Sequence, residues 1–237
     1  MNPSTSTLVN TIVANNPDFS CVLYLGGQTY LGGLMGGGNL DASGTCVGTA
    51  SPDPMLGPLQ NNGGPTQTMA PRASSLAVGN AIAANCPISD QRGFPRPFGK
   101  PCSIGAYEPG TLFGSFQTNA IVSLASQAFT VAGTFSLDAV NDGISPLTEL
   151  VQLRFGSFST TIRPGSFQPK NGGFVYVLSS VNGVPTFAMT IQPLGGNKYF
   201  FGAAAQSATL AGTANPVTVQ VTVGDDGGTT TTQARFF

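Results

Sequence analysis

The chain has 237 residues, of which only 8% are Asp, Glu, Lys or Arg, and its formal net charge is −1. That charged share is about a third of the usual one, so the surface must consist largely of Ser, Thr, Asn, Gln and Gly. There is no basic field to attract nucleic acid, and no apolar run of about 18 residues that would make a transmembrane helix. Histidine is absent, which excludes a Ser-His-Asp triad, a Cys-His dyad and the common zinc-hydrolase sites.

The N-terminal half predicts short strands joined by many corners. The run STLVNTIVANN is of β type and ends in an Asn-Asn pair, and residues 26–46 contain eight glycines. Tyr30, Leu31, Leu34 and Leu40 recur there as single apolar residues. Glycine provides positive-φ corners, and a parallel β-solenoid needs many corners and only short strands. A disordered glycine-rich linker is the alternative.

Helix is expected to be scarce. Arg72–Asn85 is the one Ala-rich window, and Gly79 interrupts it. We predict a turn or two of helix in this window and no more.

The segment DQRGFPRPFGKPCSIGAYE, from Asp90 to Glu108, concentrates charge in a chain that has little. Its three prolines lack backbone donors and fix φ, which excludes regular strand or helix. Such a loop must satisfy its backbone through side chains, and the forked Arg92 and Arg96 suit carbonyl oxygens and carboxylates. We predict that Asp90, Arg92, Arg96 and Glu108 brace a cap. The alternative is a catalytic pair of Asp90 and Glu108, or an anion site at the two arginines.

The C-terminal half predicts an antiparallel β-sandwich. Val217–Val223 alternates Val with Thr or Gln, residues 224–228 form a turn, and Thr229–Phe237 suits a hairpin partner. Asn182-Gly183 is a second hairpin turn. Further strands are predicted at Ala128–Leu137, Leu150–Phe155, Phe158–Arg163, Gly173–Val181, Thr186–Pro193 and Tyr199–Gln206. Many short strands without helical periodicity are typical of an immunoglobulin-like sandwich.

The four cysteines indicate disulfides. They lie at positions 21, 46, 86 and 102, and none forms a CxxC pair, so no redox-active role is indicated. An even count with few lysines is typical of a secreted protein. We predict Cys21–Cys46 and Cys86–Cys102; four buried free thiols in a cytosolic protein are the alternative.

Two oxygen-rich loops are candidates for calcium. Ca²⁺ prefers clustered carboxylate and amide oxygens, although turns favour Asp and Asn in any case. No other cofactor is predicted. The candidate ligands are Asp138, Asn141, Asp142 and Glu149 in one loop and Asp225 and Asp226 in the other.

Four motifs in the N-terminal half carry a resemblance to a known family. NTIVANN, GGGNLDASGTC, DPMLGPLQNNGGPTQTMAP and CPISDQRGFPRPFGKPCSIGAYE follow one another within residues 8–109. They resemble the last coils of bacterial right-handed parallel β-helix surface proteins, such as the choice-of-anchor Q proteins and relatives of polymorphic outer-membrane-protein repeats. The resemblance implies terminal β-helix coils with a closing cap over residues 1–109. Residues 110–237, with DGISPLTELVQL, GSFSTTIRPGSF and LAGTANPVTVQVTVGDDGGTTT, look more loosely like a β-sandwich that follows such helices.

The resemblance also bears on the N-terminus. The first five residues, MNPST, lack the basic and apolar regions of an export signal. We expect a fragment of a longer bacterial surface protein, or a reading frame begun at an internal Met. An open first coil would leave unpaired strand edges, so a homodimer through that end is also expected.

Two functional hypotheses follow. The first is a secreted or cell-surface module with a structural or adhesive role that binds a glycan or another surface protein; a spacer within a longer protein is a variant of it. The second is a secreted, histidine-free hydrolase or polysaccharide lyase acting on a polysaccharide, ester or lactone, with calcium as a candidate cofactor. The absence of histidine and of any nucleophile motif favours the first.

Overall fold

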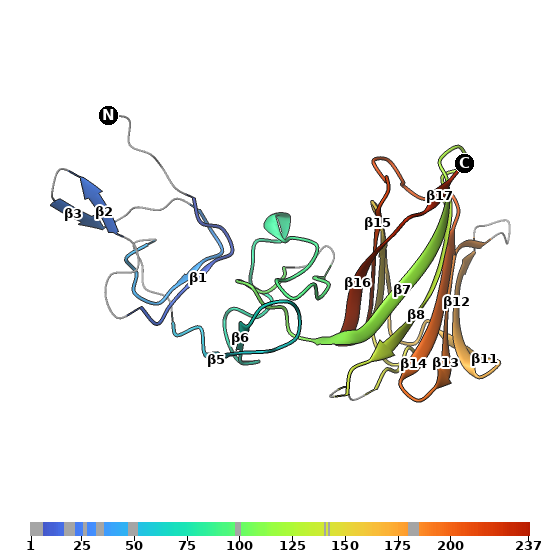
Figure 1. Ribbon diagram of the computed structural model, residues 1–237, viewed down its shortest axis with the longest axis horizontal. Coiled ribbons are helices and arrows are strands. Elements are labelled where there is room, and N and C mark those ends of the chain that lie inside the picture. Colours follow the sequence, from blue (N-terminus) through green and yellow to red (C-terminus); the bar gives the residue numbers. More distant parts are fainter. Residues whose placement is uncertain are drawn as a thin grey trace. The chain divides into compact units, whose positions relative to one another are not determined.

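The structure is a computed structural model (Figure 1). It describes residues 7–16, 22–25, 28–31, 36–46, 52–97, 101–139, 141, 143–179 and 185–237. The chain divides into two compact units, Met1–Arg92 with Arg96–Pro109 and Gly93–Pro95 with Gly110–Phe237. Almost every regular element is a strand, which confirms the all-β class.

The described residues of the first unit form three short strand pairs. One pair is parallel, β1 with β4, and two are antiparallel, β2 with β3 and β5 with β6. The bounds are β1 Ile12–Val13, β2 Val22–Leu25, β3 Gln28–Leu31, β4 Leu40–Asp41, β5 Leu56–Gln60 and β6 Thr68–Pro71. The Ala-rich window gives turns and a single 3₁₀ turn, η1 (Ala83–Asn85), as expected.

A small core holds the first unit together. Its buried members are Leu40, Ala77, Ala81, Cys102 and Ile104, against which Ile12 and Cys86 pack. These residues lie far apart in the sequence, so the core joins β1 and β4 to the segments on both sides of η1.

The second unit is one curled sheet of eleven strands. The strand order is β10-β9-β15-β16-β7-β8-β14-β13-β12-β11, and β17 pairs with β7. The bounds are β7 Thr111–Ser123, β8 Ala128–Leu137, β9 Val151–Phe155, β10 Phe158–Ile162, β11 Gln168–Lys170, β12 Gly173–Ser179, β13 Pro185–Gly195, β14 Lys198–Ala205, β15 Val217–Val223, β16 Asp226–Thr232 and β17 Arg235–Phe236.

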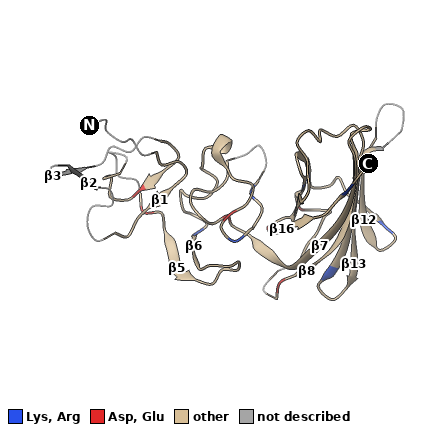
Figure 2. Ribbon diagram, turned by 45° about the horizontal axis from the view of Figure 1, so that its top comes forward, with Lys and Arg blue, Asp and Glu red and all other residues tan. Residues whose placement is uncertain are grey.

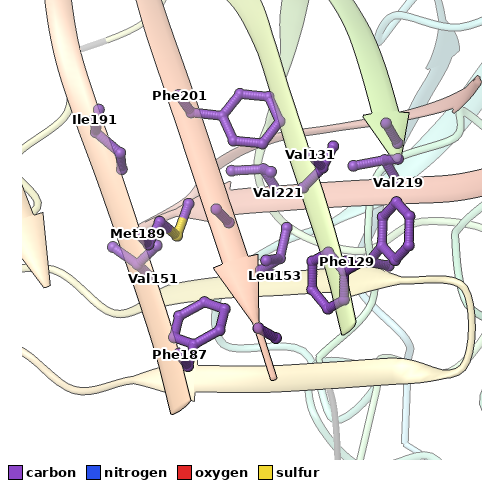
Figure 3. Packing of buried hydrophobic residues seen from close by; sticks show 14 of the residues in the cluster. Phe129, Val131, Val151, Leu153, Phe187, Met189, Ile191, Phe201, Val219 and Val221 are labelled. Carbon is purple, nitrogen blue, oxygen red and sulfur yellow. The ribbon is translucent and has the colours of Figure 1, made fainter. Parts of the chain in front are cut away.

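The sheet curls around one hydrophobic core. The Phe129 ring on β8 stacks on Phe155 of β9 with centroids 4.3 Å apart, although these strands are not neighbours in the sheet. Phe158 of β10 likewise lies 5.8 Å from Phe187 of β13. Figure 3 shows side chains of β8, β13 and β14 gathered with those of β9 and β15. The core therefore closes across the sheet rather than on one flat face.

The β15–β16 hairpin follows the alternation expected for it, with one correction. The four valines of β15 face the core and are at most 1% exposed. The turn is shorter than predicted, because Asp226 already pairs with Val223 and only Gly224 and Asp225 lie between the strands. β7 is a strand that the sequence did not predict.

Candidate functional site

The closing segment, residues 86–108, is held by many hydrogen bonds. Its backbone is irregular around the prolines, and long-range bonds such as Gln91 N to Ala106 O (3.0 Å) and Arg96 N to Ile88 O (3.1 Å) hold it. Figure 2 shows acidic and basic segments side by side in the part of this unit next to β6. This is the segment that the sequence predicted as a brace.

Arg92 ties three parts of the first unit together. Its Nε donates to Asp90 Oδ2 at 2.9 Å, Nη1 to Asn62 O at 3.1 Å, and Nη2 to Glu108 O at 2.6 Å. Its guanidinium lies 3.7 Å from the centroid of the Tyr107 ring, a cation–π contact. Two carbonyls far apart in sequence are therefore held by one side chain.

Gly64 makes the approach to Arg92 possible. Its φ is +78°, and a Cβ there would lie 2.6 Å from Arg92 Cα. Any other residue would be strained by φ and would collide with backbone.

Arg96 and Glu108 form a second centre. Arg96 Nη1 donates to Glu108 Oε2 at 2.8 Å and to Ser103 O at 2.7 Å, and Nη2 donates to Gly105 O at 2.6 Å. Glu108 also accepts from Ser103 N at 2.8 Å and Ser103 Oγ at 3.1 Å. The pair thus fixes the turn that contains Ser103 and Gly105.

All four charged side chains are buried, and each carboxylate oxygen of Asp90 and Glu108 accepts at least one hydrogen bond. Asp90, Arg92, Arg96 and Glu108 are 7%, 6%, 3% and 8% exposed. Asp90 Oδ1 accepts from Arg92 N, and Oδ2 accepts from Arg92 Nε and Glu108 N. Both oxygens of Glu108 also accept hydrogen bonds. A general acid or base must reach the substrate's proton, whereas these groups face the backbone that they hold.

Disulfides reinforce the same unit. Cys86 and Cys102 are joined across 16 residues, which confirms that predicted bond. Cys46 is disulfide-bonded as well, whereas Cys21, its predicted partner, lies outside the described residues.

The candidate calcium ligands of the first loop serve local turns. Asp138 Oδ1 accepts from Ala139 N, Asn141 Oδ1 from Gly143 N at 2.9 Å, and Glu149 Oε2 from Ser145 N at 2.6 Å. Asp142 lies outside the described residues.

The two acidic residues of the second loop differ in exposure. Asp225 is exposed at the hairpin turn, whereas Asp226 is 1% exposed within β16. In the described part of the chain, no three His, Cys, Asp or Glu side chains come together as metal ligands. Calcium at these loops stays a prediction.

The second unit has a half-buried arginine, Arg154, on β9. It lies in register with Gln220 of β15 and Ser159 of β10. Burial lowers the pKa of its guanidinium, but an arginine remains charged at neutral pH.

A hollow in the first unit was not predicted from the sequence. It has a volume of about 550 Å³ and carries amides and hydroxyls from Asn10, Thr11, Gln67, Thr68 and Gln91. Its apolar side chains come from Ile12, Leu56, Leu59 and Met69. These residues lie in three of the motifs quoted above, which are far apart in the sequence, and only the fold brings them together.

Comparisons of the chain with protein-family models, curated proteins and solved structures find no match. Among the residues described, no helix has the length and apolar character needed to cross a membrane.

Proposed function

We propose that this protein is a secreted or cell-surface module with a structural or adhesive role, which binds a glycan or another surface protein. The disulfide between Cys86 and Cys102 supports an extracellular setting, because disulfides persist in oxidising compartments. The surface, poor in charge, favours contacts through amide and hydroxyl groups rather than through ion pairs.

The proposal includes a finer architecture for the first unit, the last coils of a right-handed parallel β-helix closed by a cap. Its support is the parallel pairing of Ile12 with Leu40 and Val13 with Asp41. Asn39 extends this pairing, since its side chain accepts from Thr11 N, 28 residues earlier, and donates to Leu8 O. Parallel pairing over such a separation is what one coil makes with the next.

For the second unit we propose a β-sandwich. The support is the packing of Phe129 on Phe155 and of Phe158 on Phe187, each between strands that are not sheet neighbours. Contacts of this kind are expected where two layers face each other across a core.

The observation that carries the functional proposal is the use of the charged side chains in the closing segment. The side chains of Asp90, Arg92, Arg96 and Glu108 make nine of the hydrogen bonds given above with backbone groups or with one another. Charged groups that are hydrogen-bonded in this way stabilise the backbone of the closing segment, and a structural or adhesive module needs a stable fold.

The test is retention of the purified, labelled full chain on immobilised polysaccharides, on bacterial cells and on cells treated with protease. The proposal expects saturable retention on at least one of these surfaces and none on a blocked, uncoated support. Absence of saturable retention on every surface would contradict an adhesive role.

A further inference from the structure

We infer that the hollow of the first unit is a binding site for an uncharged oligosaccharide. This inference rests on the proposed adhesive function and names its site and ligand class. The volume of about 550 Å³ falls in the range of roughly 300–1,000 Å³ that is usual for small-ligand sites.

The lining of the hollow favours an uncharged ligand. Among the residues that the structure describes, no Asp, Glu, Lys or Arg lines the hollow. A charged ligand would lose hydration there and find no opposite charge, which is costly. A neutral ligand rich in hydroxyl groups avoids that cost.

Hydrogen-bonding capacity remains available in the hollow. In the described part of the chain the amide of Gln67 has no protein partner, and its side chain is exposed. Gln91 donates from Nε2 to Thr66 Oγ1 at 2.7 Å, which leaves its Oε1 able to accept. Each amide can donate and accept, which suits the hydroxyl groups of a sugar.

The wall around these two glutamines is fixed. Asn10 Nδ2 donates to Ile82 O at 3.2 Å, and Asn10 Oδ1 accepts from Ile82 N at 2.7 Å. The hydroxyl of buried Thr68 accepts from Asn62 Nδ2 at 3.1 Å, so that its own proton is free to be donated. Such preorganised groups lose little freedom when a ligand binds.

Apolar side chains complete the match. Leu59 of β5 is 61% exposed and pairs with Met69 of β6, and both line the hollow. A sugar ring presents C–H groups as well as hydroxyls, so an aliphatic surface beside amides suits it. A peptide would be recognised chiefly through backbone hydrogen bonds to a strand edge, whereas the polar groups that line this hollow are side-chain amides and hydroxyls.

The test is calorimetric titration of the full chain with neutral gluco-, manno- and chito-oligosaccharides and with an acidic oligogalacturonate. We expect a neutral oligosaccharide to bind with a Kd that changes little between about 0.05 and 0.5 M salt, since no ion pair is involved. Gln67→Ala/Gln91→Ala should weaken binding at least about tenfold. The matched variant Gln117→Ala/Gln192→Ala removes two exposed glutamines of the second unit and should bind like the native chain.

The outcomes separate this inference from the function on which it rests. If the Gln67→Ala/Gln91→Ala variant binds a neutral oligosaccharide as tightly as the native chain, the site is wrong and the adhesive function stands. Salt-sensitive binding of the acidic oligosaccharide alone overturns the neutral ligand class. Retention on cells that protease abolishes, with no oligosaccharide bound, points to a protein partner and overturns the inference. If the chain is retained on no surface and binds no oligosaccharide, both proposals fail.

Discussion

Arg92 donates from Nε to Asp90 Oδ2 across 2.9 Å, and the side chains of the pair are only 2% and 0% exposed. Two residues apart in sequence, they form an ion pair that water does not reach. A buried pair contributes little compared with apolar residues of the same volume, but removal of one partner leaves an uncompensated charge. The first prediction follows from that asymmetry.

Arg92→Ala should lower the free energy of unfolding of the first unit by about 3–5 kcal/mol, because the buried Asp90 carboxylate loses its counterion. The bonds to Asn62 O and Glu108 O are lost as well. Thermal unfolding should show a midpoint lowered by roughly 10 °C or more. Arg72→Ala removes an exposed arginine and is the matched control, expected within about 0.5 kcal/mol of the native chain. An unchanged midpoint in Arg92→Ala would contradict the brace.

The Glu108→Gln variant distinguishes a structural role of the Glu108 carboxylate from a catalytic one. The amide keeps the volume but removes the charge opposite Arg96 and turns an NH₂ group toward donors. We expect a loss of about 2–3 kcal/mol in denaturant unfolding. Asp225→Asn, at an exposed turn, is the control for removal of one negative charge. Native stability in Glu108→Gln, together with loss of an activity, would indicate catalysis instead.

Reduction of the Cys86–Cys102 bond should loosen the closing segment. The bond spans 16 residues, which corresponds to about 3 kcal/mol in the chain-entropy model. Hydrogen exchange with and without reductant should therefore speed up in peptides from residues 86–108, and less so in β15 and β16, which have their own core. Alkylation of Cys86 in the absence of reductant would show that the bond does not form.

Gly133 in β8 should tolerate no side chain. A Cβ there would lie 2.1 Å from Gln117 O and 2.9 Å from the Phe201 ring. Gly133→Ala should cost about 2–3 kcal/mol, because backbone and core must shift. Gly202→Ala on the paired strand β14 is the control, since its nearest contacts, in the Phe200 ring, are 3.4 Å away. Equal stability of the two variants, measured by thermal unfolding, would contradict the packing around Phe201.

The strands best predicted are those whose apolar and polar residue types alternate. Val217–Val223 alternates valine with Thr or Gln, and its four valines are at most 1% exposed. The predicted strand Ala128–Leu137 has the same bounds as β8. β7 was not predicted, and its pairing with β8 shifts register between Phe113 and Ser115, which breaks the period of two near its start. A bulge of this kind is set by the partner strand, and the local sequence does not record it.

The closing segment was predictable in its composition but not in all of its partners. Prolines and forked arginines indicated a loop that side chains must satisfy, and the structure brings Asp90, Arg92, Arg96 and Glu108 together. That Arg92 reaches Asn62 O, 30 residues away, depends on the fold. The hollow depends on the fold even more, since the motifs that contain Gln67 and Gln91 do not indicate that these two residues line one hollow.

We propose that this protein binds its ligand and does not transform it. The most direct measurement is mass spectrometry of a panel of polysaccharides, aryl esters and lactones after incubation with the full chain, in calcium or in EDTA. We predict that every substrate keeps its mass, including any polysaccharide that retains the protein. A product that forms with the native chain and not with heat-denatured protein would contradict it.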